Sequence, residues 1–537
     1  MSHRSDSDIP DHHPGQVIMS RGMIAGLVCV LLGAIDLTVI AAILPRIIPD
    51  LGVNTADIDR YIWTVSGYLV AYIVAIPLFG RLSDIVGRQR TFIICLILFL
   101  IGSVLCALAE GLSDLVIGRT VQGFGGGGIL PVTIALAGDT LSRRQQLAGI
   151  GIVGAAETIG WMLGPVYGAT VVGVVPVADE AWRWVFWLNV PLLLGALALV
   201  RRSFPNDRTA FQFRHLGRLD AIGGVLLALG LAAVNLALAS SGESGAATQN
   251  GLRALGGNPN PLAAQTPWLL TLAGVTLVGF AIWTRRAPFP LLPLSMLRTR
   301  QGIAVISANF LIGAVLMIAM VNIPVFIALL SDLDSATSRT AVLLAPFTIA
   351  IAATSLAVER ISRRLGDRIA ALTGVALTTA GCVLLYVLID ESRVWALVPG
   401  LVVAGIGIGT VLPPLGTIPV ASAPVEDRGA AASTALMFRL LGMTLGASAL
   451  TALGVRRLQA LTGRIDPIVR GADETTASYL ERQRQFIEEH AVPLSVQVIQ
   501  ETFLVAAFIA AMAILPLWVI GHYRNIGHND ATPVLHG

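Results

Sequence analysis

Lysine is absent from this 537-residue sequence, and only 13% of its residues are charged. Hydrophobic residues make up 55% of the chain, and the mean hydropathy is +0.76. A soluble domain cannot bury that much apolar surface, so the composition indicates a polytopic membrane protein. The net charge of +3 is too small to predict a nucleic-acid partner.

Cysteine is also scarce, and recognisable catalytic motifs are missing. Cys29, Cys95, Cys106 and Cys382 lie in apolar runs without the spacing of metal ligands, so we expect buried thiols and no metal site. The sequence shows no Ser-His-Asp arrangement, metal-binding cluster or phosphate-binding loop. It therefore predicts neither an enzyme nor a bound cofactor.

Fourteen apolar runs are long enough to cross a bilayer as helices. They lie near residues 23–46, 61–80, 91–109, 114–137, 147–172, 182–200, 219–239, 267–284, 303–330, 340–358, 369–389, 394–420, 430–455 and 496–521. Residues 1–20 are polar and the first run is long enough to span, so we expect no cleavable signal.

Arginines gather in alternate loops between these runs. The basic loops contain Arg81, Arg88 and Arg90; Arg143 and Arg144; Arg201, Arg202, Arg208, Arg214 and Arg218; Arg285, Arg286, Arg298 and Arg300; and Arg360, Arg363, Arg364 and Arg368. The other loops are mixed or acidic. By the positive-inside rule the basic loops are cytoplasmic, and this places both termini in the cytoplasm.

The chain also repeats itself. Gly123-Phe-Gly-Gly-Gly-Gly-Ile-Leu-Pro131 matches Gly405-Ile-Gly-Ile-Gly-Thr-Val-Leu-Pro413 at an offset of 282 residues, and the segments around Glu157 and Arg439 share that offset. Two six-helix units of the same orientation therefore flank two accessory helices, a 6+2+6 arrangement in an all-α integral membrane protein.

The corresponding domain boundaries follow from the runs and repeats. We expect a cytoplasmic tail (1–22), a first six-helix bundle (23–200), a linker with two accessory helices (201–300), a second six-helix bundle (301–522) and a short cytoplasmic tail (523–537).

Four motifs, in this order and topology, resemble the major facilitator superfamily and its fourteen-span drug:proton antiporter branch. They are Asp36-Leu-Thr-Val-Ile-Ala-Ala-Ile-Leu-Pro45, Gly80-Arg-Leu-Ser-Asp-Ile-Val-Gly-Arg-Gln-Arg90, Arg119-Thr-Val-Gln-Gly123 and Gly160-Trp-Met-Leu-Gly-Pro-Val-Tyr-Gly168. The resemblance covers nearly the whole chain. It implies a secondary active transporter of the bacterial inner membrane, driven by protons and acting by alternating access.

Shorter segments resemble the mycobacterial lipid exporters of this branch, which work with a periplasmic triacylglyceride-binding lipoprotein. They are Gly118-Arg-Thr120, Leu130-Pro-Val-Thr-Ile-Ala-Leu136, Gly154-Ala-Ala-Glu157, Leu163-Gly-Pro165 and Trp187-Leu-Asn-Val-Pro-Leu192. This resemblance implies a lipid cargo, with triacylglyceride as one candidate, a lipoprotein partner and a monomer surrounded by membrane lipids. Export of hydrophobic drugs and dyes is the alternative, and a membrane scaffold for a lipid carrier is an alternative of another class.

Asp36 stands about thirteen residues into the first apolar run, near mid-membrane. A carboxylate at that depth must face a cavity or a partner, because insertion costs about 2.5–3.5 kcal/mol. The matching position in the second repeat is Leu316, so the fold itself does not require an acid. We predict that Asp36 carries the coupling proton; a packing carboxylate bonded to hydroxyls is the alternative.

Glu157 and Arg439 are each the lone charge within a long apolar helix, at equivalent positions of the two repeats. The pseudo-symmetry predicts an ion pair where the two halves meet. Protonation of Glu157 would release Arg439 and act as a switch, whereas a purely structural tether is the alternative. Asp36 lies at a similar predicted depth and could compete for the same guanidinium.

Two further sets of residues follow from the family motifs. Arg119 lies towards the outer end of its span; the resemblance makes it part of the proton pathway, and the alternative is an arginine that reaches the outer interface. Gly80, Asp84, Gly87, Arg88 and Arg90 form a cytoplasmic gate motif in which Asp84 accepts from an arginine or a helix N-terminus.

Gly160, Gly164, Pro165 and Gly168 have the small-residue spacing that lets helices approach closely, and Gly442 and Gly446 repeat it. The glycines would support either rocking of one half against the other or static close packing. The segment 456–495 has helical periodicity, so we expect an outward helical hairpin that guides a lipid or docks a carrier, with a plain solvated loop as the alternative.

Overall fold

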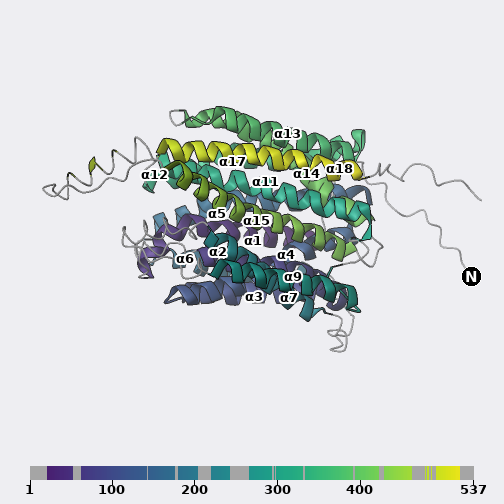
Figure 1. Cartoon of the computed structure of the whole chain (residues 1–537). Coiled ribbons are helices and arrows are strands. Elements are labelled where there is room, and N and C mark those ends of the chain that lie inside the picture. Colours follow the sequence, from purple (N-terminus) through teal and green to yellow (C-terminus); the bar gives the residue numbers. More distant parts are fainter. Residues whose placement is uncertain are drawn as a thin grey trace, which may run out of the picture.

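The computed structural model describes residues 21–51, 62–141, 143–175, 180–203, 219–241, 265–292, 296, 298–330, 333–390, 393–422, 428–462, 478, 481–482, 485 and 492–520. Over these residues the chain is helical throughout, and the long helices run nearly side by side (Figure 1). The first-half helices are α1 (Arg21–Asp50), α2 (Ile62–Val86), α3 (Arg88–Ala107), α4 (Leu112–Thr140), α5 (Arg143–Val174) and α6 (Arg183–Ser203). The accessory helices are α7 (Ala221–Ser241) and α9 (Thr266–Arg286). The second-half helices are α11 (Arg300–Leu330), α12 (Leu333–Leu365), α13 (Asp367–Leu388), α14 (Val398–Ser422), α15 (Arg428–Thr462), α17 (Val492–Met512) and the short α18 (Ile514–Val519).

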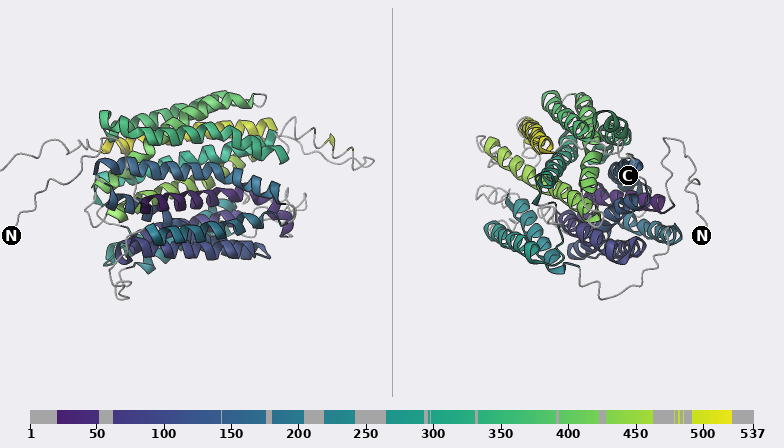
Figure 2. Two further views of the ribbon diagram at one scale, coloured as in Figure 1. Left: turned by 180° about the vertical axis from the view of Figure 1, so that it is seen from behind. Right: turned by 90° about the vertical axis from the view of Figure 1, so that its right-hand side faces the viewer.

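Helix packing in the first half recurs in the second. In the first half α1 packs on α5, α2 on α4, and α3 on α4 and α6. In the second half α11 packs on α15, α12 on α14, and α13 on α14 and α17. Seen along the helices, the purple and blue first half and the green and yellow second half lie on opposite sides of the molecule (Figure 2). The predicted internal repeat is therefore visible in the pairing of the helices.

Two glycines mark equivalent corners of the repeats. Gly87 has φ = 99° between α2 and α3, and Gly366 has φ = 85° between α12 and α13. Side chains with a Cβ avoid this left-handed region, so both corners require glycine. These are the only residues with positive φ in the described part of the chain. The sharp reversal after the second helix of each half therefore has the same cause.

Eleven described helices are long and apolar enough to cross a membrane, and a twelfth is added if the bent α5 counts as one span. The bend of 41° separates Gly149–Trp161 from Val166–Val174. Pro165 lies in this break and lacks the N–H that would bond the carbonyl of Trp161. Thr38 of α1 donates its hydroxyl to that carbonyl at 3.0 Å. The shorter apolar segments Ala221–Ala237 and Val342–Val358 lie within α7 and α12.

The glycine stripe of α5 packs against α1 of its own half. A Cβ on Gly160 would lie 2.8 Å from the carbonyl oxygen of Leu31, and one on Gly168 would lie 2.8 Å from Cγ2 of Val39. In the second half, Gly442 of α15 faces the Phe310 carbonyl of α11 in the same way. The stripes therefore join helices within each half. These contacts within each half favour the close-packing alternative, and a role in rocking of one half against the other stays a prediction.

An aspartate joins the two accessory helices to each other, and an arginine of α2 attaches them to the first half. Asp220, at the start of α7, accepts from the Trp283 indole at 2.7 Å and from the backbone N–H of Leu291 at 3.0 Å. Arg81 of α2 donates to the carbonyl of Pro290 at 3.4 Å. Because α7 also packs on both α2 and α15, it covers the side of the molecule where the two halves adjoin.

Most of the predicted outward hairpin, 456–495, lies outside the described residues, as do the tail 523–537 and nearly all of 1–22. The helices that lead to the hairpin are described. α15 continues to Thr462, beyond the expected end at 455, and α17 begins at Val492. Arg457 and Glu501 join these two helices with contacts of 2.8 and 3.0 Å.

Substitution of Gly442 by alanine should destabilise the protein by about 1–3 kcal/mol, because the added methyl would overlap the Phe310 carbonyl. The matched control is Gly195→Ala in α6, where no atom lies within 4 Å of the added Cβ. That control should be neutral or slightly stabilising. The midpoint of thermal unfolding in detergent measures both, and equal midpoints would contradict the close packing of α11 on α15.

Candidate functional site

Asp36 lies in a polar network buried inside the first half. It sits in the middle of α1 with 1% of its surface exposed. Arg119 of α4 donates to its Oδ2 at 2.8 Å, and Gln122 and Asn189 donate to its Oδ1 at 2.9 and 2.8 Å. Three donors facing one carboxyl group suit its ionised form, which only accepts hydrogen bonds. A proton arriving at Asp36 would remove the negative charge that these donors share and so weaken the contact with Arg119.

Arg119 is fully buried and has aromatic as well as polar contacts. Its guanidinium carbon lies 4.1 Å from the centre of the Tyr68 ring, which is a cation–π distance. Gln122 accepts from Arg119 at 2.8 Å and donates to Ser103 of α3 at 2.9 Å. The network thus draws on α1, α2, α3, α4 and α6.

This burial contradicts the interpretation of Arg119 as an arginine that reaches the outer interface. The sequence-based placement counted residues from the outer ends of the spans. In the structure α1 continues to Asp50 and α4 begins at Leu112, so the ends of the two helices do not mark a common depth. The long arginine side chain makes up the remaining distance to Asp36.

Asn189 was not predicted as a site residue, and neither were Gln122, Ser103 and Tyr68. A signal existed for Asn189, since an amide in the middle of the apolar run 182–200 needs a polar partner. Gln122 stands in the motif that contains Arg119. Serine and tyrosine are common in membrane helices, and the sequence alone does not distinguish Ser103 and Tyr68 from packing residues.

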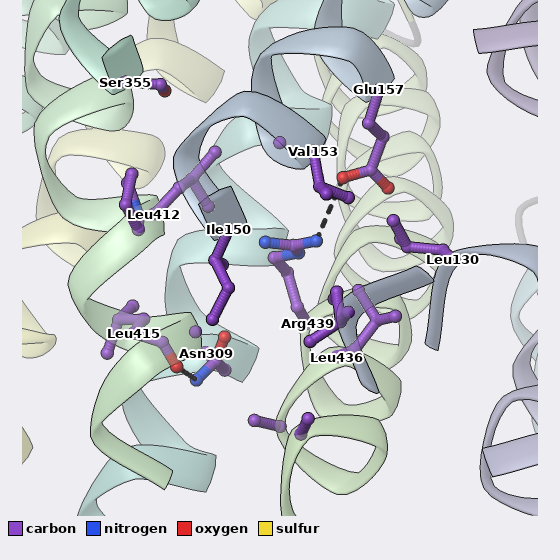
Figure 3. A pocket seen from close by; sticks show the side chains of 16 residues that line it. Leu130, Ile150, Val153, Glu157, Asn309, Ser355, Leu412, Leu415, Leu436 and Arg439 are labelled. Atoms are coloured by element: carbon purple, nitrogen blue, oxygen red, sulfur yellow. Dashed lines mark hydrogen bonds and ion pairs between the residues drawn. The ribbon is translucent and has the colours of Figure 1, made fainter. Parts of the chain in front are cut away.

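Glu157 and Arg439 form the ion pair that the repeat predicts. Arg439 Nη2 lies 3.1 Å from Glu157 Oε2, across the boundary between α5 and α15 (Figure 3). Both side chains are nearly buried: that of Glu157 is 7% exposed and that of Arg439 is 11% exposed. The expected competition between Asp36 and Glu157 for Arg439 is wrong in this structure, because Asp36 is bound to Arg119.

The Glu157–Arg439 pair faces a cavity between the two halves. Its lining comes from α4, α5, α11, α12, α14 and α15, as the close-up shows for ten labelled residues (Figure 3). The cavity volume is about 40 Å³. That space holds a few water molecules, whereas ligand pockets measure about 300–1,000 Å³. In this conformation the space beside the ion pair is too small for a cargo molecule, and we call this conformation closed.

The two ion pairs differ in how firmly they are held. Asp36 receives three donors inside one bundle, and Arg119 has a second polar partner and an aromatic ring beside it. Glu157 receives one hydrogen bond from Arg439 among the described residues. The buried Nε atoms of Arg119 and Arg439 both lack a partner there, so the difference lies in the number of donors around each carboxylate. The pair between the halves is therefore the one that a movement of the halves can break most easily.

The cytoplasmic gate motif forms a compact charge cluster at the corner between α2 and α3. Arg88 bonds Asp84 at 2.5 Å and Asp139, at the end of α4, at 2.9 Å. Ser83 donates to the Gly80 carbonyl at 2.7 Å, and Gly87 supplies the positive φ. Arg90 is half-buried in the first turn of α3. Asp84 therefore accepts from an arginine, and the sequence did not point to Asp139 as a second acceptor.

No group of three or more metal-ligating side chains occurs in the part of the chain that is described. Two repeated helical bundles enclose a small, mostly apolar cavity that contains one ion pair, an architecture typical of membrane transport proteins. The family model of the Major Facilitator Superfamily matches residues 26–447. The chain belongs to the major facilitator superfamily.

Curated relatives share much of the sequence. A triacylglyceride transporter of Mycolicibacterium smegmatis is 36% identical over 452 residues, which cover 81% of this chain and 75% of the relative. A triacylglyceride transporter of Mycobacterium tuberculosis strain H37Rv is 34% identical over 480 residues, which cover 85% and 86%, respectively. The similarity extends over most of both proteins.

Solved structures agree in fold. The human organic anion transporter MFSD10 has a TM-score of 0.56 and 15% identity, covering 93% of this chain and 99% of its own. The proton:xylose symporter XylE has a TM-score of 0.57 and 15% identity, covering 92% and 95%. At this level of identity the likeness concerns the arrangement of helices.

Replacing Arg119 by methionine should cost about 3–5 kcal/mol, because Asp36 is then left buried without its counter-ion. Adding Asp36→Asn to the same chain should recover most of the loss. Thermal unfolding of the purified variants measures both effects. The control is Arg457→Met, which breaks an exposed pair and should change the midpoint little. Equal midpoints for Arg119→Met and Arg457→Met would contradict the buried network.

Charge exchange tests the pair between the halves. Glu157→Arg alone places two cations at the cavity wall and should destabilise the protein by about 3 kcal/mol or more. The double variant Glu157→Arg with Arg439→Glu restores opposite charges and should regain much of that stability. The same unfolding measurement applies. A double variant less stable than either single variant would show that the two side chains do not interact.

Proposed function

We propose that this protein is a proton-coupled exporter of lipid, with triacylglyceride as the favoured cargo, that works by alternating access in a bacterial inner membrane. Membership of the superfamily supports transport, and the names of the mycobacterial relatives support a lipid cargo. The observation that carries the coupling mechanism is the Asp36 carboxylate, buried among Arg119, Gln122 and Asn189.

The proposed coupling step is the protonation of Asp36. A neutral carboxyl group no longer attracts Arg119 as an ion, so the guanidinium shifts towards Gln122 and the Tyr68 ring. The α1–α4 contact then rearranges inside the first half. A carboxylate with several polar neighbours can bind and release a proton reversibly, as a coupling site requires. A packing carboxylate needs no such set of exchangeable partners.

Glu157 and Arg439 serve as the gate in this proposal. Their contact closes one wall of the cavity in the present conformation. Separation of α5 from α15 would break the pair and leave both charges facing a water-filled cavity, where hydration replaces the lost contact. The pair thus favours the closed form without making the open form inaccessible. The Asp84–Arg88–Asp139 cluster is the proposed cytoplasmic gate.

The proposed topology has fourteen spans in a 6+2+6 arrangement with both termini in the cytoplasm. The arginine distribution among the loops supports it, and each predicted span coincides with a helix. We further propose that the protein acts as a monomer and that a periplasmic lipoprotein accepts the lipid at the segment 456–495. The extension of α15 to Thr462 supports a structured outward segment.

Two other functions make different predictions. A multidrug:proton antiporter would move dyes under a pH gradient and leave lipids in the bilayer. A membrane scaffold for a lipid carrier would move neither. The two buried ion pairs favour a transporter over a scaffold, because charges inside a membrane bundle carry an insertion cost that a passive support need not bear.

Transport in proteoliposomes with an imposed pH gradient tests the proposal. The wild type should move a fluorescent triacylglyceride analogue at a rate that falls when a protonophore collapses the gradient. Asp36→Asn should reduce this rate at least about tenfold, since the amide cannot exchange the proton. Parallel assays with a lipophilic dye distinguish the drug antiporter from the lipid exporter.

Asp50→Asn is the matched control, because it changes the same residue type in the same helix. Asp50 binds Trp182 and Arg183 at the far end of α1 and lies outside the Asp36 network. The transport rate of the Asp50→Asn variant should stay close to that of the wild type. Gradient-driven lipid transport that survives Asp36→Asn unchanged would refute Asp36 as the coupling site.

A further inference from the structure

Helix α14 contains prolines that remove hydrogen bonds from its own backbone. Pro413, Pro414 and Pro419 lie inside the helix and lack an N–H. In a regular helix the N–H of a residue bonds the carbonyl four positions earlier. Pro413 and Pro419 therefore leave the carbonyls of Gly409 and Leu415 without a helical donor, and Pro414 does the same for the carbonyl of Thr410. In a dry membrane interior, each such carbonyl needs a partner from elsewhere.

Side chains of two neighbouring helices supply partners for the carbonyls of Gly409 and Leu415. Ser355 of α12 donates its hydroxyl to the Gly409 carbonyl at 3.2 Å. Asn309 of α11 donates Nδ2 to the Leu415 carbonyl at 3.3 Å and to the Val305 carbonyl of its own helix at 3.0 Å. Two separate prolines are thus matched by two separate donors. Both donors are buried, with 3% and 2% exposed, respectively.

Both donors line the cavity that holds the Glu157–Arg439 pair (Figure 3). The first half contacts the second near these two donors. A Cβ on Gly151 of α5 would lie 2.9 Å from the carbonyl oxygen of Ser355, and a Cβ on Gly416 of α14 would lie 3.2 Å from Ile150. The proline-interrupted part of α14 is therefore covered by α5 in this closed conformation.

We propose that residues 409–419 of α14 form a hinge and that Ser355 and Asn309 are latches that hold it in the closed conformation. When α5 moves away, water enters the widened cavity and can bond the two carbonyls, so the latches are no longer needed. The helix then bends at the prolines at little cost. This inference rests on the alternating access of the proposed function.

A static role is the competing explanation. Thr38 provides an example, because it caps the Trp161 carbonyl at the bend in α5 and is not among the residues that line the cavity. A static cap contributes to folding and leaves the balance of closed and open forms unchanged. A latch changes that balance. Measuring both the ratio of open to closed forms and the stability of the protein therefore distinguishes the two roles.

Distance measurements by double electron–electron resonance, made on the full-length protein in nanodiscs, provide this test. Spin labels are placed through Gln145→Cys on α5 and Arg360→Cys on α12, on the side of the closed contact that lies beyond Gly151 and Ser355. The native cysteines are buried and stay unlabelled. The wild type should show mainly the short distance. Ser355→Ala and Asn309→Leu should each raise the ratio of open to closed forms about fivefold, the effect of one lost hydrogen bond.

Replacing each proline by alanine shows whether the effect of a latch depends on the proline that it serves. Pro413→Ala restores the N–H that bonds Gly409, so Ser355→Ala should change the ratio less than twofold in that background. Pro419→Ala should cancel the effect of Asn309→Leu in the same way. The matched control is Thr348→Val, which removes a buried hydroxyl of α12 that bonds its own helix at 3.2 Å. This control should leave the ratio unchanged.

Two results would overturn the latches. One is a lower unfolding midpoint for Ser355→Ala and Asn309→Leu with wild-type distances. The other is an equal shift with and without the prolines. Ser355→Thr retains the hydroxyl and should behave as the wild type, which covers the case in which Ser355→Ala does not fold. The measurement needs neither cargo nor a pH gradient, so its outcome is independent of the test of Asp36.

Discussion

A charge inside a membrane bundle is tolerated only when an opposite charge or a set of polar groups meets it, and this requirement organises the structure. Asp36 and Arg119 satisfy it within the first half, where three donors converge on one carboxyl group. Glu157 and Arg439 satisfy it across the boundary between the halves, through a single hydrogen bond. The first arrangement couples helices of one rigid unit, and the second depends on how the two units meet.

The same requirement applies to the backbone. Glycines remove side chains where α5 lies on α1 and where α15 lies on α11, so the helices of each half pack closely. Prolines act in the opposite direction, because each one frees a carbonyl that must be bonded elsewhere. Thr38 meets this need inside the first half, and Ser355 meets it on the cavity wall. In the proposed hinge, the position of the donor, rather than the proline alone, distinguishes a fixed bend from a movable one.

Much of this arrangement could be predicted because membrane helices are recognisable from their apolar composition. The apolar runs located the helices, and the offset of 282 residues matched Glu157 with Arg439 before any contact was known. The partner of Asp36 could not be derived in this way. Arg119 is 83 residues away, outside any repeat relation with Asp36, and the depth of each residue depends on where α1 and α4 end. Asn189 and Ser103 joined the network only when five helices were placed around one point.

The sequence by itself determined the class of protein, the helices, the repeat and the ion pair that the repeat implies. These depend on local properties, namely hydropathy, loop charge and spacing along the chain. The tertiary structure decided which acid binds which arginine, which surface the glycine stripes cover and which side chains bond the carbonyls freed by the prolines. Those choices depend on helix ends, tilts and facing sides, which follow from packing across the whole bundle and leave no periodic signal in the sequence.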